Sequence, residues 1–227
     1  MNPQKAIIFD SSTLISFAMN SLFEEFKRLK KIFNGKFLIT KEVKEEIIDK
    51  PLNIKRFELE ALKIKQLLDE GILEMPDSLG IKNDEISRQT RDIIHIANST
   101  FKAREEYVHM IDSGEASCLA LSVMLSKKNI KNVIAADERT TRMLSEKPEN
   151  LQELMQKKLH TKINSKKENF KFFKGFKIIR SAELVYIAYK RGLIDIKNKN
   201  VLDALLYAVK FKGCSISDIE IEEIKRM

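Results

Sequence analysis

The sequence is poor in the residues that interrupt secondary structure. It holds only seven Gly and four Pro among 227 residues, and it has no Trp. This scarcity argues against long disordered segments or long loops without structure. Hydrophobic residues make up 43% of the chain, which is enough to build a core. We therefore expect one sizeable and mainly helical domain, with or without an appendage.

Cysteine and long apolar runs are also scarce. The only two cysteines, Cys118 and Cys214, are far apart and form no CxxC pair. They exclude a disulfide framework and a cysteine-based zinc site, and they fit a reducing compartment. No stretch approaches the ~20 apolar residues of a membrane span, and the first apolar run is very short for a signal peptide. We expect a soluble, cytoplasmic protein with no membrane partner.

Positive charge is in excess and concentrated in one segment. Lys and Arg number 41 against 33 Asp and Glu, which gives a net charge of +8. Residues 147–180 alone contribute +7. A concentrated basic patch favours a nucleic-acid partner, although lysine-rich surfaces also arise from solubility or thermostability alone. The candidate nucleic-acid-binding residues are Lys157, Lys158, Lys162, Lys166, Lys167, Lys171, Lys174, Lys177 and Arg180.

Four phenylalanines lie between the lysines of this basic segment. They are Phe170, Phe172, Phe173 and Phe176. Exposed rings beside lysines can stack on the bases of a single strand. Core packing or a protein interface explains such phenylalanines more often than base stacking does, and both interpretations stay open.

Strands and helices are expected to alternate along the chain. Short apolar runs at 5–9, 36–40, 72–75 and 132–136 predict strands. Helical spacing predicts helices over 22–33, 41–48, 54–71, 84–110, 114–125, 138–144, 182–192 and 201–213, and a last helix beginning near 215. This alternation predicts a parallel α/β sheet with helices on both faces. We expect a domain over 1–146, a basic insertion or linker over 147–180, and C-terminal helices over 181–227 packed on the domain.

Acidic residues recur where the predicted strands end. Asp10 and Asp137 directly follow two of them, and Glu46 lies in the helix after another. Asp112 and Glu115 open the most apolar helix. Sites in parallel α/β sheets form outside the carboxyl ends of the strands. Carboxylates gathered there repel one another, and a divalent cation such as Mg²⁺ or Mn²⁺ removes that repulsion and can activate water.

Each acidic residue also has a structural explanation. Asp10 and Asp137 can cap the helices that follow them. Asp112 and Glu115 fit a capping box, and Glu46 fits a solvated helix face. The stretch "FDSST" is not a haloacid-dehalogenase motif, because that motif needs an Asp where Ser12 stands. The three histidines show no ligand spacing.

The order of these motifs resembles the PIN domain family of metal-dependent ribonucleases, as found in stand-alone archaeal and bacterial members. The motifs are "IIFDSSTLI", "LITKEVKEEI", "DSGEASCLALS" and "VIAADERTTRML", and the resemblance continues into the C-terminal helices. It implies a three-layer α/β/α fold with a C-terminal helical extension. It also implies a Mg²⁺ or Mn²⁺ site formed by Asp10, Glu46, Glu115 and Asp137, with Asp112 as an alternative third acid and Ser12 positioning Asp10.

The resemblance implies an endoribonuclease that hydrolyses RNA phosphodiester bonds. Toxin–antitoxin ribonucleases are common in this family, so a protein inhibitor similar to an antitoxin and a homodimer are further expected partners. DNA stays open as a substrate. One departure is Ala136, which stands where many members carry Thr or Ser. It favours the alternative function, a PIN-fold subunit that binds RNA or serves as a scaffold with little or no catalysis.

Overall fold

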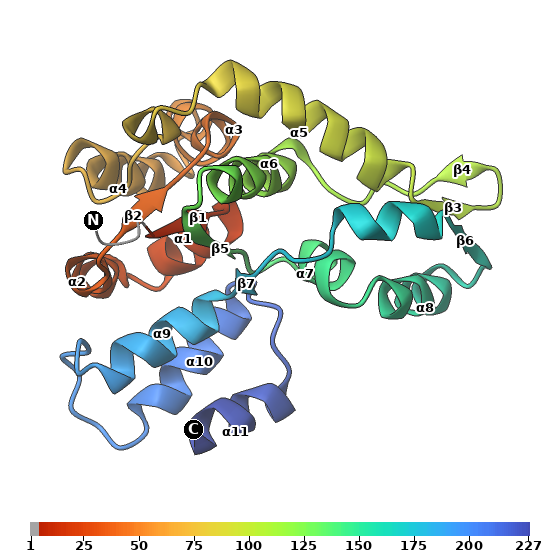
Figure 1. Cartoon of the computed structure of the whole chain (residues 1–227). Coiled ribbons are helices and arrows are strands. Elements are labelled where there is room, and N and C mark those ends of the chain that lie inside the picture. The colour runs from red at the N-terminus through yellow and green to blue at the C-terminus, as the bar shows by residue number, and fades with distance from the viewer. Residues whose placement is uncertain (1–4) are drawn as a thin grey trace.

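A four-stranded parallel sheet forms the centre of the molecule (Figure 1). The computed structural model describes residues 5–227. The strand order is β2-β1-β5-β7, and every neighbouring pair is parallel. The strands are β1 Lys5–Phe9, β2 Lys36–Leu38, β5 Lys131–Ala135 and β7 Ile178–Ile179. The expected parallel α/β sheet is thus confirmed.

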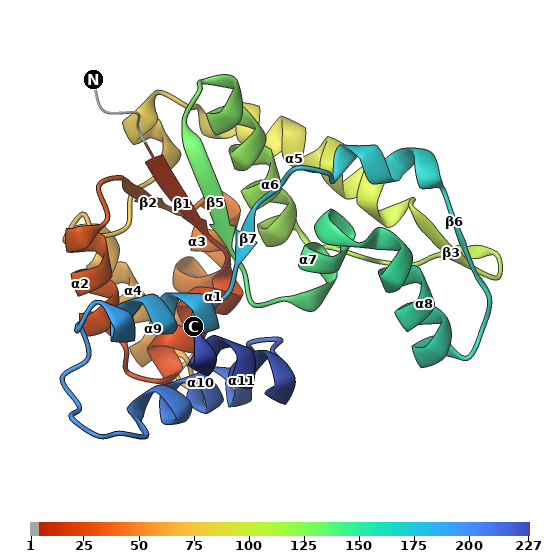
Figure 2. The same ribbon diagram turned by 60° about the horizontal axis from the view of Figure 1, so that its bottom comes forward.

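Helices cover both faces of this sheet (Figure 2). Side chains alternate along each strand, so Ile8, Leu38 and Ile134 share one face. Helix α6 (Ser113–Lys127) packs on that face against β1 and β5. On the opposite face, side chains of β1, β2 and β5 meet α2 (Phe23–Ile32) and α9 (Ser181–Lys190). The remaining helices surround these layers and are α1 Ser11–Met19, α3 Lys41–Lys44, α4 Glu58–Asp69, α5 Asn83–Asn98, α7 Arg139–Glu146, α8 Pro148–Leu159, α10 Val201–Phe211 and α11 Asp218–Arg226.

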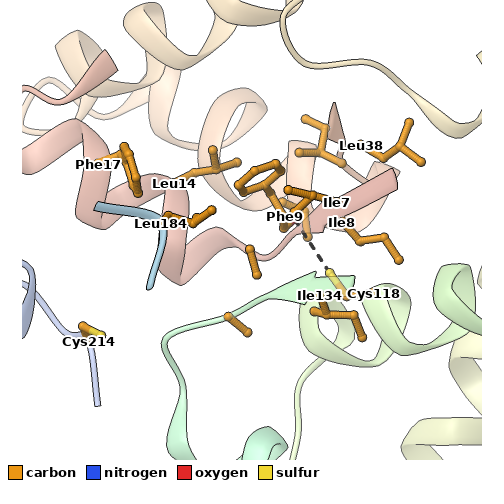
Figure 3. Close-up of a cluster of buried hydrophobic side chains, with 14 of the residues drawn as sticks. Ile7, Ile8, Phe9, Leu14, Phe17, Leu38, Cys118, Ile134, Leu184 and Cys214 are labelled. Carbon is orange, nitrogen blue, oxygen red and sulfur yellow. Dashed lines mark hydrogen bonds between the residues drawn. The ribbon is translucent and has the colours of Figure 1, made fainter. Parts of the chain in front are cut away.

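The core is continuous around β1 (Figure 3). Phe9 is fully buried, and its ring meets Phe26 and Phe37 edge to face with centroids 4.9 Å apart in each pair. The Cys118 thiol donates to the Phe9 carbonyl, at 3.8 Å. Truncating a buried Phe to Ala in such a site costs about 3–5 kcal/mol of stability. This packing fixes the direction of β1 and therefore the position of the residue that follows it.

The long helix expected over 84–110 is wrong in its second half. Helix α5 ends at Asn98, and the chain continues into β3 (Phe101–Ala103) and β4 (Glu106–Tyr107). Asn98 explains the break, because its side-chain oxygen accepts the backbone N–H groups of Met110 and Ile111, at 2.7 and 3.1 Å. The expected strand over 72–75 is also wrong, since Glu74 forms only a single parallel bridge to Leu38.

The basic segment 147–180 is folded into the molecule. It contributes α8, β6 (Ile163–Ser165), a 3-10 segment (Lys167–Phe172) and β7. Strand β6 completes an antiparallel sheet of order β4-β3-β6, while β7 joins the central sheet. We call α8, β3, β4, β6 and the 3-10 segment the basic lobe. Phe170 and Phe173 are buried in its interior, which confirms the core-packing interpretation for these two rings.

The C-terminal helices α9, α10 and α11 pack together beside α1 and α2. Helix α9 contacts α10, α2 and α1, and α11 contacts α10. The last segment returns toward the sheet, because the Ser215 N–H donates to the carbonyl of Asp137, at 3.1 Å. Within residues 5–227, no helix is long and apolar enough to cross a membrane.

Candidate functional site

Asp10 lies at the carboxyl end of β1, where the backbone fixes it. Its N–H donates to the Ala135 carbonyl of β5, at 2.9 Å, and only 2% of the residue is exposed. Oδ2 caps helix α1 by accepting from the Ser12 N–H at 3.2 Å and from Ser12 Oγ at 2.5 Å. Oδ1 is buried and has no hydrogen-bond partner among residues 5–227. Capping therefore explains one oxygen of Asp10 and leaves the other unexplained.

Ser12 connects the ends of two neighbouring strands. Its hydroxyl donates to Asp10 and accepts the backbone N–H of Asp137 at 3.0 Å, just after β5. These two bonds orient the Asp10 carboxylate relative to β5. The supporting position predicted for Ser12 agrees with this geometry.

Glu46 reaches the same place from the segment after β2. Thr40 caps α3 by accepting the Val43 N–H, and the helix continues as a π-helical turn over Glu45–Asp49. Such turns shift side chains around the helix axis and are frequent at functional sites. Glu46 lines the pocket beside Asp10, and the neighbouring Glu45 pairs with Lys41 at 3.6 Å.

Gly114 leaves space where Asp10 and Glu46 approach each other. A Cβ atom at Gly114 would lie 2.7 Å from Glu46 Oε2 and 3.9 Å from Asp10 Oδ1. The first distance is shorter than real Cβ contacts allow, so any other residue would displace Glu46. Two carboxylate oxygens from β1 and from the segment after β2 thus converge near the start of α6.

Glu115 and Asp112 differ in burial although they are three residues apart. The Glu115 carboxylate accepts the Asp112 N–H at 2.9 Å and the Thr141 hydroxyl at 2.7 Å. Burial raises the pKa of Glu115 to about 7, with smaller contributions from the charges of Asp10 and Glu138. The Asp112 side chain is 82% exposed and contacts His109 Nε2 at 2.8 Å. Glu115 is therefore the better placed third acid, and it also serves the expected helix cap.

The acidic side chains share one pocket of about 310 Å³. It is lined by Asp10, Ser11, Ser12, Glu46, Met110, Asp112, Glu115, Glu138 and Gly213. Glu138 is an acidic residue of this lining that was not predicted from the sequence. It caps α7 by accepting the N–H groups of Arg139 and Thr140. The sequence signal for it was weak, because an acid directly before a helix usually means a cap.

Asp137 is separate from the other acids. Its Oδ1 accepts the backbone N–H of Ser181 at 2.7 Å, at the start of α9, and its Oδ2 is buried without a partner in the described part of the chain. Burial raises the pKa of this carboxyl group. Asp137 does not line the acidic pocket, whereas the next residue, Glu138, does.

Burial disfavours the ionised forms of these acids, and a nearby positive charge would offset that cost. Desolvation raises the pKa of Asp10, and desolvation together with the Asp10 charge raises the pKa of Glu46. Within residues 5–227, no three His, Cys, Asp or Glu side chains are close enough together to hold a metal ion. The oxygen donors are nevertheless of the kind that Mg²⁺ and Mn²⁺ prefer, and Asp10 Oδ1, which has no hydrogen-bond partner within residues 5–227, lies near Glu46. The residues therefore fit a hard cation in the type of their donors.

The predicted nucleic-acid-binding residues fall into two groups. The eight lysines from Lys157 to Lys177 are all exposed. Arg180 is only 6% exposed, and its guanidinium contacts Glu183, Glu220 and the Ser215 carbonyl. Its prediction as a nucleic-acid contact is wrong, because those groups occupy its donors. Arg180 instead connects β7, α9 and α11.

Two features of the molecule thus bear on function, the acidic pocket and the exposed basic lobe. No family model, curated protein or solved structure matches this chain. A function for this chain is therefore inferred from the chemistry of the acidic pocket and the basic lobe.

Proposed function

We propose that the chain is a metal-dependent endoribonuclease of the PIN type, acting at the acidic pocket. The observation that carries this proposal is the buried Asp10 Oδ1, which has no hydrogen-bond donor within the described residues 5–227 and lies near Glu46. An ionised oxygen without a partner is costly inside a protein, and a bound cation removes that cost. The exposed lysines of the basic lobe supply a surface for a polyanionic substrate.

The cation would be held by Asp10 and Glu46, with waters as its remaining ligands, because Mg²⁺ is usually bound through one or two carboxylates and keeps several waters. Glu115 and the exposed Asp112 line the same pocket and would contact those waters. When bound, Mg²⁺ or Mn²⁺ would activate a water molecule and neutralise charge that develops at phosphorus. Ser12 holds Asp10 in its orientation, and Gly114 keeps the space beside Glu46 open. Glu115 has a pKa of about 7, which suits it to take a proton on a carboxylate oxygen near neutral pH.

The order of elements supports assignment to a PIN-like three-layer fold. One acid follows β1, a second lies in the helix after β2, a third opens α6, and Asp137 and Glu138 follow β5. This order is the one that the sequence resemblance implies. An inhibitor protein similar to an antitoxin and a homodimer remain predictions from the same resemblance, and a cytoplasmic location remains a prediction from the composition.

A second candidate function is a PIN-fold subunit that binds RNA or acts as a scaffold without turnover. Two observations favour it. Asp137 contacts α9 and does not line the pocket, and within residues 5–227 no three ligating side chains come together. Under this alternative, RNA binds the basic lobe and no metal is needed.

Cleavage of end-labelled single-stranded RNA distinguishes the two functions. We would compare wild type with Asp10→Asn in Mn²⁺, in Mg²⁺ and in EDTA. Asp69→Asn serves as the matched control, since Asp69 is exposed on α4. We expect metal-dependent products from wild type and the control, and a loss on the order of 100-fold or more in Asp10→Asn. A labelled DNA strand of the same sequence tests the alternative substrate.

Three results would contradict the proposal. RNA that binds equally well in EDTA and is never cleaved supports the scaffold function. Cleavage of DNA alone would replace RNA as the substrate. Cleavage that survives Asp10→Asn would remove the acidic pocket from the reaction.

A further inference from the structure

The small antiparallel sheet of the basic lobe has one buried and one exposed face. Lys102 of β3 pairs with Tyr107 of β4 and with Asn164 of β6, so these three residues form a row across the sheet. The neighbouring positions Phe101 and Ile163 are buried on the opposite face. The row containing Tyr107 therefore belongs to the exposed face.

Tyr107 is an exposed aromatic ring beside two lysines. Half of the residue, 51%, is exposed. Lys102 Nζ and Lys166 Nζ lie 5.9 and 5.0 Å from the centroid of its ring. Lys166 also lowers the pKa of the Tyr107 hydroxyl. Lys102 in addition contacts Glu105 in the exposed turn, at 3.0 Å. An aromatic face next to ammonium groups is the combination that binds a base together with its phosphate.

Tyr107 also borders a groove against helix α5. The groove has a volume of about 370 Å³ and is lined by Tyr107 together with α5 residues and the residue after them, namely Arg91, Ile94, His95, Asn98 and Ser99. The α5 members are spaced three and four residues apart, so they share one face of the helix. This groove therefore has an aromatic wall on one side and, on the other, a helix face that carries Ile94 and the exposed Arg91.

The groove adjoins the acidic pocket through three side chains. Asn98 Nδ2 lies 3.2 Å from His109 Nδ1, and His109 Nε2 lies 2.8 Å from Asp112 Oδ1. Asp112 lines the acidic pocket, and Asn98 lines the groove. Figure 1 shows that the β3–β4 hairpin follows the C-terminal end of α5 and that the chain then returns to the start of α6.

We propose that this groove, referred to as the Tyr107 groove, binds single-stranded RNA by stacking one base on Tyr107, with phosphates held by Lys102, Lys166 and Arg91. Single strands are favoured because only an unstacked base presents its face to an aromatic ring. The strand then continues past Asn98 and His109 toward Asp112. That last step rests on the proposed nuclease function, whereas binding at Tyr107 does not.

The binding test uses a fluorescein-labelled oligouridine of twelve nucleotides in EDTA, measured by fluorescence anisotropy with the full chain. We expect Tyr107→Ala to weaken binding by about tenfold, within the range for loss of one base stack. Tyr107→Phe keeps the ring and should bind within about twofold of wild type. The matched control is Phe57→Ala, since Phe57 is 46% exposed and its ring lies 5.4 Å from Arg56 Cζ, outside the basic lobe. It should also bind within about twofold.

Photo-crosslinking locates the base independently of any substitution. With 5-iodouracil in the RNA, we expect the crosslink in the tryptic peptide over 105–127, which contains Tyr107. The proposal is overturned if wild type does not bind the oligonucleotide, if Tyr107→Ala binds as wild type does, or if the crosslink lies outside this peptide. Equal losses in Tyr107→Ala and Phe57→Ala would also overturn it. Binding that depends on Tyr107, without cleavage in Mn²⁺, would contradict the nuclease function and leave the Tyr107 groove intact.

Discussion

The acidic pocket and the basic lobe use charge in opposite ways. In the pocket, Asp10 is buried and Glu115 is half-buried, and desolvation raises the pKa of Asp10, Glu46 and Glu115. In the lobe, the lysines project into solvent around an exposed ring. Buried charge requires a partner at a fixed position, whereas exposed charge attracts a polyanion without fixing it. The first arrangement suits a metal ion and the second suits a mobile strand.

Arg180 shows that sequence position alone does not decide which role a charge has. It ends the basic segment, yet it is buried against Glu183 and Glu220 and stabilises the fold. The lysines before it are exposed. Three experiments test this contrast between buried and exposed charge.

The largest effect is expected from Arg180→Met. Removing the buried Arg180 guanidinium leaves the carboxylates of Glu183 and Glu220 without their cation. The side chains of these two glutamates are each about one third exposed. We expect the free energy of unfolding to fall by about 3 kcal/mol, measured by urea denaturation followed by circular dichroism. Lys171→Met, at an exposed position, should change it by less than about 0.5 kcal/mol. Equal effects of the two changes would show that Arg180 is not structural.

An intermediate effect is expected from Glu115→Gln in the metal-free protein. The folded pKa of Glu115 is about 7, above its ordinary value of 4.5, so the folded state binds this proton more tightly than the unfolded state does. The resulting stability is present below pH 4.5 and is lost as the pH rises through 7. Between pH 5 and pH 8, wild type should therefore lose on the order of 2 kcal/mol more than Glu115→Gln.

Urea denaturation of both proteins in EDTA measures that difference. Asp10 and Glu46 titrate in the same direction and are present in both proteins, so their contributions cancel to first order in the comparison. A difference between wild type and variant that is the same at both pH values would contradict the raised pKa of Glu115.

The smallest effect is expected from Lys166→Ala. If Lys166 neutralises one phosphate, its loss reduces the slope of log Kd against log salt by about 0.7 for a single strand. Lys31→Ala, on α2 outside the basic lobe, should leave the slope unchanged. Titration of the oligouridine at several salt concentrations in EDTA measures both. Equal slopes for Lys166→Ala and wild type would remove Lys166 from the Tyr107 groove.

The sequence predicted those parts of the site that depend on local pattern. A buried apolar run ending in Asp10 placed that residue at the edge of the sheet, and the structure has it there. Glu46 was predictable because it lies in the helical segment that follows β2. Glu115 was predictable because it lies in the first turn of α6. Glu138 was hidden, since its capping role is indistinguishable in sequence from that of many acids that only cap.

The rest depends on contacts between segments that are distant in the chain. The Asp137 carboxylate contacts Ser181, and no local pattern reveals that bond. Asn98 ends α5 by bonding to Met110 and Ile111, so a stretch with helical spacing contains two strands instead. Tyr107 was missed for the same reason, because it lies within the stretch expected to be helical.

Direct binding of Mn²⁺ tests the central claim, that the acidic pocket holds a divalent cation. Electron paramagnetic resonance of free Mn²⁺ would be followed for wild type, Asp10→Asn and Gly114→Ala, with Asp69→Asn as control. Gly114→Ala retains every carboxylate and displaces only Glu46. We expect wild type and Asp69→Asn to bind Mn²⁺, and Asp10→Asn and Gly114→Ala to bind it at least about tenfold more weakly. Absence of binding by wild type, or equal affinity in all four proteins, would contradict it.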